Sequence, residues 1–600
     1  MTTETYIDAS CISRMSITIA RIQVQECGHP VYGQGGCTAT RAEPCDHVLE
    51  TCPSRCDFIC KNVDYVHTDC KTSQVGNSYE PDIVDFPDYG LGSVEFCKGL
   101  PQSGTISLTL QDSPGCDYPD RYRNTRPSGP DNDGYRLARF EQKHDLEGRL
   151  LEVGIGYCGQ PYPSSFFNAR YYIDSFTGPN GRECRWTIVA KDALSLLANS
   201  ASQYPSNNDI TKLSSDYVQG EFTDLTLLLQ DNLGDQFGDE RIICLKGEAM
   251  RVEYRGQTQL FNHFYLIKER EMCGSTRITD TVEAGEDVYF AAYWPKGTNI
   301  ADVYLDLLTK GAGLPVEDQT CDCGPYESCI VDVESFAEWA DTCGKLYVIP
   351  ETIICKPTGL RELFDELAIF GVMPYLDDCD QKIKLHHYRP TWCDPHQDLP
   401  VFYENDLINC RVDVTPKPAE RYTSVDIRGN PADCTKGVDD SNLVLLGRMQ
   451  GLAGVGDVCG NPNWLPPKNR SLKSRFLGGC NAYLVPRLAQ RIWYARRKKV
   501  KQIRFRVHAS RLPVNLRKTS FFMLRHKKLE TKRVPPAVYW LTRLRPVRGN
   551  CWEITAMTSG FDASQRWKSQ VKTCEGDCAH AIAEPRQCDA DYDVGCALTY

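Results

Sequence analysis

The stretch TISLTLQD, residues 105–112, alternates polar and apolar side chains along its first seven positions. Successive side chains of an extended chain point to opposite faces, so its three aliphatic side chains share one face. Two similar stretches follow, RLLEVGIGY (149–157) and NARYYIDSFTG (168–178). Short strands separated by turns are typical of β-barrels and β-sandwiches. The sequence therefore predicts a fold that is mainly β.

Two further regions carry strand patterns. One is ERIICLKGEAMRVEYRGQTQLFNHFYLIKERE (240–271). The other ends in YWLTRLRPVRGNCWEITAMTSGF (539–561), which predicts a closing hairpin turned at Arg548 to Asn550. We expect β structure to return near the end of the chain, after an intervening region of a different kind.

Helical patterns interrupt the strands. NIADVYLDLLTKGAGLP (299–315) predicts one amphipathic helix, and TGLRELFDELAIFGVMPYLDD (358–378) predicts another with Thr358 at its cap. Asp192 is placed to cap a shorter helix. The predicted fold class is mainly β with α+β inserts. Its predicted parts are an N-terminal cysteine-rich metal-loop region (1–95), a first β-barrel domain (96–200), a second β domain (201–300), an inserted α/β domain (301–395), a returning β-barrel domain with one helix (396–570) and a cysteine-containing tail (571–600).

Four cysteines, Cys27, Cys37, Cys45 and Cys52, recur at similar intervals in a glycine-rich loop. Four thiolates can complete the shell of one zinc ion or hold one iron-sulfur cluster. Their spacing is C-x9-C-x7-C-x6-C, and the chain contains no C-x2-C pair of the kind that zinc ribbons use. This favours a cluster over zinc. Disulfides and unlinked buried thiols remain open alternatives.

A second set of cysteines lies in the tail, where Cys574, Cys578, Cys588 and Cys596 are spaced C-x3-C-x9-C-x7-C. Two interpretations are open: a second metal loop, or a terminal segment that packs on a neighbour. The first residues show no basic stretch followed by an apolar one, so we expect no secretory signal and folding in a reducing cytoplasm. No apolar run is long enough to predict a membrane segment.

Charge is unevenly distributed. The chain carries a net charge of -11, which disfavours non-specific nucleic-acid binding by the whole molecule. The segment 471–548 contains 22 Lys and Arg against one acid, Glu530. This basic segment could face phosphate or an acidic partner. It could equally form a solvated barrel exterior or an intersubunit salt-bridge surface.

The chain lacks the common catalytic motifs. It contains no phosphate-binding G-x4-G-K-[ST], no H-E-x2-H and no G-x-S-x-G. His386 and His387 are adjacent on a predicted strand, where neighbouring side chains cannot chelate one ion together. We therefore predict that the protein is not an enzyme.

An ordered series of motifs resembles the tail-tip (baseplate) hub proteins of long-tailed bacteriophages, which are related to contractile-phage baseplate hubs and gene-transfer-agent hubs. The series consists of C-x3-V-Y-G-x3-C-T-A (27–39), WTIVAKDALSLLA (186–198), ADVYLDLLTKGAGLP (301–315), TGLRELFDELAIFGVMPYLDDCDQKIKLHHYRP (358–390) and LAQRIWYAR (488–496). The resemblance implies two tube-like β-barrel domains of phage hub type with smaller inserted domains. It also implies a homotrimer that closes into a pseudo-sixfold ring.

The resemblance implies a role as well. Such a ring continues the tail tube, adapts the sixfold tube to a threefold tip and lets DNA pass through its lumen on ejection. Its expected partners are the distal tail protein, the C-terminal end of the tape-measure protein and the central fibre or tail-tip protein. The expected location is the virion, after assembly in the host cytoplasm.

Members of related tail-tip families bind a [4Fe-4S] cluster through four cysteines, which implies Cys27, Cys37, Cys45 and Cys52 as ligands here. Cys56, Cys60 and Cys70 leave the fourth ligand open. Rival functions are a disulfide-rich receptor-binding adhesin of the tail, a tail-associated hydrolase and an iron-sulfur enzyme.

Overall fold

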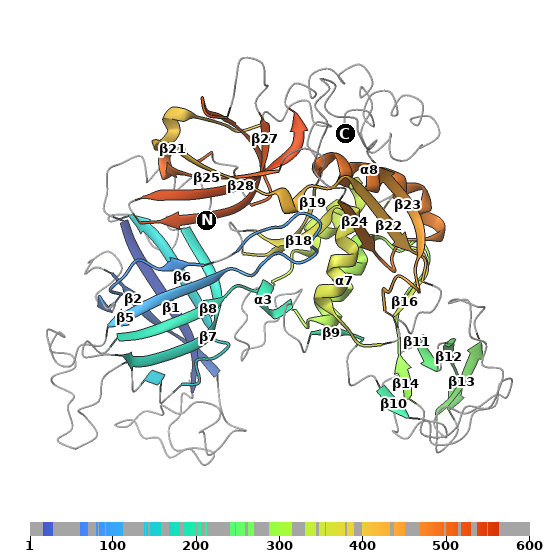
Figure 1. The fold of residues 1–600 in the computed structure, drawn as a ribbon. Coiled ribbons are helices and arrows are strands. Elements are labelled where there is room, and N and C mark those ends of the chain that lie inside the picture. The colour runs from blue at the N-terminus through green and yellow to red at the C-terminus, as the bar shows by residue number, and fades with distance from the viewer. Residues whose placement is uncertain are drawn as a thin grey trace, which may run out of the picture.

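The computed structural model (Figure 1) shows two large β-sheets, a central group of helices and several small sheets. The structure describes residues 16–27, 60–69, 80–81, 83–90, 92–111, 137, 140–141, 144–157, 167–180, 185–197, 202–205, 210–212, 241–245, 248–257, 262–268, 287–314, 330–343, 347–354, 356–377, 381–388, 399–431, 437–450, 468–496, 500–513, 516, 518–529, 537–548 and 550–562.

The first sheet has eight strands in the order β3-β2-β1-β6-β7-β8-β5-β4. The stretch quoted first forms β5, and its side chains alternate between buried and half-buried positions, as predicted. The strands are β1 (Ser16–Cys27), β2 (Cys60–Thr68), β3 (Glu80–Pro81), β4 (Asp88–Tyr89), β5 (Thr105–Gln111), β6 (Leu150–Tyr157), β7 (Phe167–Asn180) and β8 (Arg185–Lys191).

The N-terminal region was expected to be loop-rich, and this is wrong for two long segments. β1 pairs antiparallel with β6, so residues 16–27 belong to the first sheet. β2 extends the sheet on the other side of β1. Ala20, Ile22 and Val24 alternate along β1 and face the core, and this period-two pattern is the signal that the glycines and cysteines nearby obscured.

The second large sheet has six strands in the order β20-β26-β27-β28-β25-β21. Its last two strands in sequence form the predicted hairpin, with Val547 opposite Cys551 across the turn. The strands are β20 (Val401–Tyr403), β21 (Leu407–Pro416), β25 (Lys501–His508), β26 (Phe521–Arg525), β27 (Ala537–Val547) and β28 (Cys551–Asp562).

The two large sheets share one hydrophobic core, although they come from opposite ends of the chain (Figure 1). Leu151 and Ile188 of the first sheet belong to the same cluster of buried side chains as Phe505 and Ile554 of the second. The backbone N–H of Val94 donates to the Thr542 carbonyl at 3.0 Å.

The expectation of two closed tubes is not met in the parts of the chain that the structure describes. The fold is mainly β and contains a half-barrel sheet. Neither large sheet pairs its two end strands with each other, so neither closes into a barrel. Each sheet instead closes its apolar face against the other sheet. A sheet that buries one face this way needs no barrel closure to remove that face from water.

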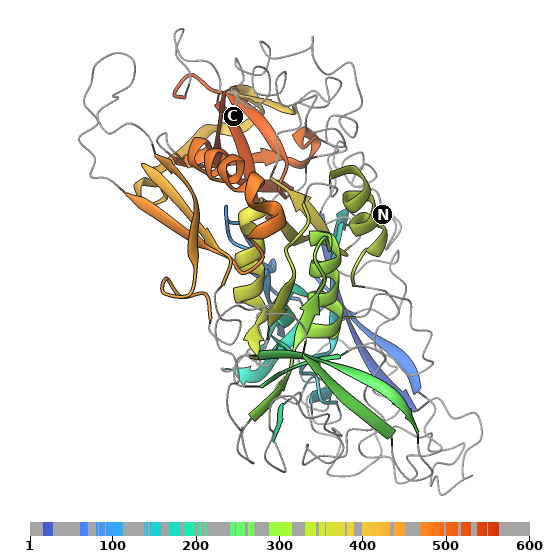
Figure 2. The same ribbon diagram turned by 90° about the vertical axis from the view of Figure 1, so that its right-hand side faces the viewer.

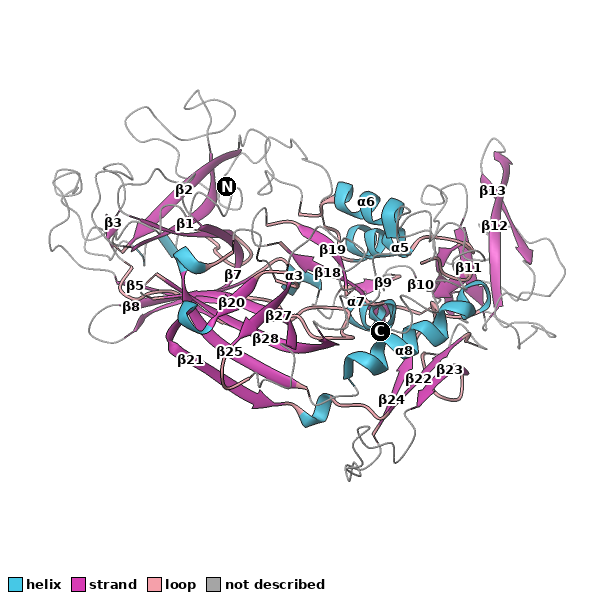
Figure 3. Ribbon diagram, turned by 90° about the horizontal axis from the view of Figure 1, so that it is seen from above, coloured by secondary structure: helices cyan, strands magenta, loops and turns pink. Residues whose placement is uncertain are grey.

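The central helices form a second core with strands on both sides. In Figure 3 the helices lie between the large sheets and the small sheet that contains β11 to β13. Thr358 was expected to cap the second helix, but the cap is Gly359 and no side chain caps α7. The helices are α3 (Leu194–Leu197), α5 (Ile300–Asp306), continued by a π-helical turn (Leu307–Gly311), α6 (Val333–Cys343), α7 (Leu360–Leu367) and α8 (Val485–Arg496).

Several small sheets surround these helices. Figure 2 shows a five-stranded sheet at the far end of the molecule from α8. Among the described residues, no helix is long and apolar enough to span a membrane. The small sheets contain β10 (Ile210–Lys212), β14 (Asp287–Phe290), β11 (Arg241–Leu245), β12 (Glu248–Gln257) and β13 (Asn262–Lys268); β15 (Ala292–Trp294) and β16 (Thr352–Ile354); β9 (Gln203–Tyr204) and β17 (Thr358–Gly359); β18 (Val372–Leu376) and β19 (Ile383–His387); and β22 (Ser424–Gly429), β23 (Val444–Gln450) and β24 (Asn469–Lys473).

Candidate functional site

A row of charged side chains crosses the middle of the first sheet. Glu152 of β6 lies directly opposite Arg21 of β1 and Arg170 of β7 in the strand register. The Glu152 carboxylate accepts hydrogen bonds from both guanidinium groups, at 2.8 Å from Arg170 Nε. Leu151 and Val153, the neighbours of Glu152, point into the shared core. The row therefore lies on the opposite face of the sheet.

The second sheet carries the same arrangement. Glu553 of β28 lies directly opposite Arg506 of β25 and Arg545 of β27. Its carboxylate accepts from Arg545 Nε at 2.8 Å, from Arg506 Nε at 3.2 Å and from Arg504 Nη2 at 2.7 Å. Trp552 and Ile554 beside it belong to the core. Both large sheets thus place a nearly buried glutamate between arginines of the two flanking strands.

The arginines determine how Glu553 ionises. Burial opposes ionisation of its carboxylate, but the hydrogen bonds from Arg504 and Arg506 and the charges of Arg504 and Arg545 outweigh burial and lower its pKa. The Glu553 side chain is only 2% exposed, whereas Arg504 and Arg506 are half exposed. A single buried anion therefore holds three cations at the surface of the second sheet.

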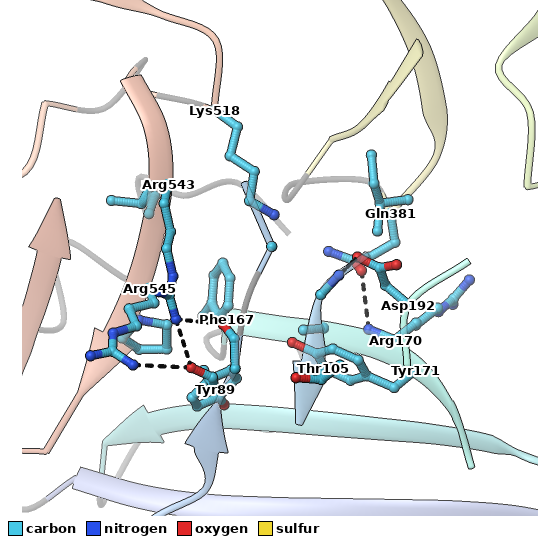
Figure 4. Close-up of a pocket in the computed structure, with 17 residues that line it drawn as sticks. Tyr89, Thr105, Phe167, Arg170, Tyr171, Asp192, Gln381, Lys518, Arg543 and Arg545 are labelled. Atoms are coloured by element: carbon cyan, nitrogen blue, oxygen red, sulfur yellow. Dashed lines mark hydrogen bonds between the residues drawn. The ribbon is translucent and has the colours of Figure 1, made fainter. Parts of the chain in front are cut away.

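A crevice of about 50 Å³ lies where the two large sheets and the β18–β19 hairpin meet (Figure 4). On one side, Arg543 and Arg545 reach the Tyr89 carbonyl, with 3.1 Å between each guanidinium nitrogen and the oxygen. On the other side, the Arg170 backbone N–H donates to Gln381 Oε1 at 3.0 Å. These contacts connect the second sheet and the inserted hairpin to the first sheet.

Burial lowers the pKa of Arg543, and the neighbouring charge of Arg545 adds to the effect. Gly90 lies in the same crevice, and a Cβ there would fall 1.8 Å from the Thr105 hydroxyl oxygen. A side chain at this position would force the Thr105 side chain to move, so glycine suits the close approach of β5 to the residues after β4. The crevice serves chiefly as a junction between the three parts of the fold.

The predicted cysteine site falls mostly outside the described residues. Cys27 ends β1, and its backbone pairs with that of Cys60 at the start of β2. Cys37, Cys45 and Cys52 lie in the undescribed segment between these two strand ends, and the tail cysteines also lie outside the described part. Where the structure describes the chain, no three His, Cys, Asp or Glu side chains are grouped to hold a metal ion. The metal site remains a prediction.

The basic segment is divided between the interior and the surface. Arg475 is buried and ion-paired with Glu366, with 2.9 Å between Arg475 Nη2 and Glu366 Oε1. Arg496 is 1% exposed and lies over the Phe96 ring, 4.3 Å from its centroid. Arg504 instead lies on the outer face of the second sheet. Composition could not distinguish these environments, which depend on tertiary packing.

The two adjacent histidines have separate structural contacts, as predicted. His387 Nε2 lies 3.0 Å from Arg491 Nη1 and 3.3 Å from the Tyr347 hydroxyl. His386 contacts the ring of Tyr375, and burial lowers its pKa to about 4. The predicted cap Asp192 is confirmed, because its Oδ1 accepts from the Leu194 N–H at 3.2 Å.

Neither glutamate row was predicted from the sequence. A signal was present, because Glu152 is the single acid of the stretch LLEVGI and Glu553 is the single acid of the stretch CWEITA. If the carboxylate at such a position is buried, it needs a cationic partner, because an unpaired charge is costly to bury. The arginines that supply it are on neighbouring strands, and finding them required the strand register.

These features define a mainly β protein in which two antiparallel sheets share a core and carry matching Arg-Glu-Arg rows. No protein-family model and no curated protein sequence matches this chain. Structures that align with part of this chain include three tail proteins, each at a TM-score below 0.5, and these alignments do not establish a common fold.

A tail protein from Neisseria meningitidis MC58 aligns with a TM-score of 0.34 and 10% identity over 77% of this chain and 90% of that one. The 43 kDa tail protein of prophage MuSo2 from Shewanella oneidensis aligns with a TM-score of 0.34 and 10% identity over 78% of this chain and 97% of that one. Prophage tail protein gp18 from Listeria monocytogenes EGD-e aligns with a TM-score of 0.26 and 8% identity over 78% of this chain and 86% of that one.

Proposed function

We propose that this chain is the structural hub of a phage tail tip. Three copies close into a ring that continues the tail tube and lets DNA pass on ejection. The observation that carries the proposal is the pair of matching rows, Arg21-Glu152-Arg170 and Arg506-Glu553-Arg545, on two sheets that share a core. The ordered sequence motifs of the tail-tip hubs support the same role.

The two large sheets of each chain bear on the symmetry of the ring. A chain that contains two similar wall units occupies two positions of a ring, so three chains supply six positions. Identical chains in head-to-tail contact form a closed ring when the rotations from one chain to the next add up to a full turn. A threefold assembly of doubled units can therefore meet a sixfold tube on one side and a threefold tip on the other.

The proposal extends to partners and location. The ring would contact the distal tail protein, the C-terminal end of the tape-measure protein and the central fibre, in a virion assembled in the host cytoplasm. Its role is mechanical and not enzymatic. The two ion-paired rows and the shared core suit this role, because they stiffen both sheets without requiring a bound substrate.

The experiment for the ring is a mass measurement of the purified full-length chain by light scattering over a range of protein concentrations. We expect a species of three times the 67.7 kDa chain mass as concentration rises. A chain that stays monomeric throughout, or that forms only dimers or tetramers, would contradict a trimeric hub.

We also propose a [4Fe-4S] cluster, or alternatively zinc, bound by Cys27, Cys37, Cys45 and Cys52. The pairing of Cys27 with Cys60 supports a closed loop, because it brings together the two ends of the segment that contains the other three. A cluster there would order a polar loop that cannot build a core of its own.

The cluster is tested by anaerobic purification followed by iron, sulfide and zinc analysis of wild type and Cys37→Ser. Cys410→Ser is the matched control, because Cys410 is an exposed free cysteine on β21. We expect about four irons per chain, retained in Cys410→Ser and absent from Cys37→Ser. Metal-free wild type, or equal metal in both variants, would disprove the cluster while leaving the ring untouched.

A further inference from the structure

The outer face of the second sheet carries a band of arginines that we call the arginine face. It spans four neighbouring strands, β21, β25, β28 and β27. In Figure 3 β21 and β25 lie along the outer side of the molecule, away from the central helices. The arginine face consists of Arg411, Arg504, Arg506 and Arg545, together with the carboxylates of Asp413 and Glu553.

The strand register places these side chains on one face. Asp413 of β21 lies opposite Arg504 of β25, and Arg506 lies opposite Glu553. Arg411 lies beside a register shift in β21, and its ion pair with Asp413, with 3.2 Å between Arg411 Nε and Asp413 Oδ1, places its guanidinium next to that carboxylate. Strands are spaced by about 4.8 Å, so the arginine face is about 15 Å wide.

The arginine face is positively charged even after its ion pairs are counted. Four guanidinium groups share two carboxylates, which leaves two net positive charges. Arg411 is 75% exposed, and Arg506 is 53% exposed. Each guanidinium has five N–H donors in a planar fork, more than the shared carboxylates can accept. Arg411, Arg504 and Arg506 thus present N–H donors to solvent beside buried Glu553 and exposed Asp413, whereas Arg545 is only 22% exposed and also donates to the Tyr89 carbonyl.

The arginine face has no apolar anchor among the residues that the structure describes. Val414 is the exposed aliphatic side chain of β21, but it lies two residues after the core residue Val412 and so falls on the other face. Tyr403, half exposed, belongs to β20 at the far edge of the sheet. Protein partners are usually held by aromatic and aliphatic anchors in dry pockets. A charged face without them fits a polyanion better than an acidic protein.

We propose that the arginine face binds the phosphate backbone of double-stranded DNA without reading its sequence. Guanidinium forks match phosphate oxygens in a bidentate geometry, and such contacts position DNA but do not specify bases. The chain as a whole carries a net charge of -11, which keeps DNA binding local to this face, weak and sensitive to salt. The inference goes beyond the hub role and does not require the ring.

The experiment is fluorescence anisotropy of a short labelled DNA duplex titrated with the full-length chain at several salt concentrations. The test variant is Arg504→Gln with Arg506→Gln. The matched control is Lys296→Gln with Arg361→Gln, which removes two exposed positive charges elsewhere, near α5 and on α7. Far-UV circular dichroism checks that each variant is folded.

We expect wild type and control to bind equally, with affinity falling as salt rises. The test variant should bind about tenfold or more weakly, and the slope of log K against log salt should decrease in magnitude by about 0.9 for each phosphate that is no longer neutralised. Arg411→Gln is the second variant, because Arg411 pairs only with exposed Asp413 in the described structure and its replacement should not disturb folding. Arg411→Gln should also lower the affinity for the duplex.

Three outcomes would overturn the inference. Wild type that fails to bind the duplex at low salt is one, and equally weakened binding in test and control variants is another. The third uses a polyglutamate peptide as a competing polyanion. If the peptide binds wild type more tightly than the duplex does, and Arg411→Gln abolishes that binding, the arginine face belongs to an acidic protein partner.

Discussion

Phe167 of the first sheet and Trp552 of the second meet edge to face, with 5.0 Å between their ring centroids. Phe167 begins β7, and Trp552 lies near the start of β28, so the contact joins segments far apart in the sequence. Trp552 is 2% exposed. The association of the two sheets therefore depends on large apolar side chains that neither sheet could bury alone.

Replacing Trp552 with alanine should lower the free energy of unfolding by about 3–5 kcal/mol, because it removes buried aromatic area and leaves a cavity. Urea denaturation of the full-length chain measures this. Tyr403→Ala is the control, since Tyr403 is 55% exposed and its removal should cost at most about 0.5 kcal/mol. A decrease below about 1 kcal/mol in Trp552→Ala would mean that the sheets do not depend on each other.

The buried ion pair between Glu366 and Arg475 should be sensitive to removal of either partner. Arg475→Met leaves the Glu366 carboxylate buried without its cation, and we expect the urea unfolding free energy to fall by about 3–5 kcal/mol. The control is Lys310→Met, which breaks the exposed pair with Asp306 and should cost less than about 1 kcal/mol. Similar decreases in both variants would contradict the buried geometry.

Glu553 should make the fold sensitive to acid. Its pKa is lower in the folded chain than its usual value of 4.5, so its contribution is present above that value and disappears as the pH falls through the folded pKa. Glu553→Gln should therefore be less stable than wild type at neutral pH, with the gap narrowing below about pH 4.5. Urea unfolding at a series of pH values measures it. A gap that is constant with pH would show that Glu553 is not held ionised by its arginines.

Two cysteines should differ in reactivity. Cys97 is buried, and burial raises its pKa to about 12, so little thiolate is available for alkylation. Cys410 is exposed on β21. Iodoacetamide labelling of the native chain, followed by peptide mass spectrometry, should modify Cys410 and leave Cys97 unmodified until urea is added. Rapid native labelling of Cys97 would contradict its burial in the core around the central helices.

Local pattern was sufficient for the elements that bury one face. The alternation in β5, the hairpin at 548–550 and the amphipathic run that became α5 could each be read from the sequence, because burial on one side imposes a period of two or 3.6. β1 was missed although it alternates, since the surrounding glycines and cysteines suggested a loop. Thr358 was assigned as a cap one residue too early, which is within the usual disagreement over helix ends.

Register and the partnering of charges could not be predicted. Glu152 and Glu553 look alike in sequence only as isolated acids, and most of their arginines lie far away along the chain. Which strand adjoins which is decided by the whole sheet, because β1 pairs with β6 across more than a hundred residues. The basic segment likewise gave no hint that Arg475 is buried and Arg504 exposed.

The measurement that tests the central claim most directly is electron microscopy of the purified full-length chain at the concentrations where it assembles, with the rotational symmetry determined from averaged end-on views. The hub account predicts closed rings with threefold symmetry and six similar wall segments, two from each chain. Rings with another number of chains, or assemblies in which each chain supplies a single wall segment, would contradict it.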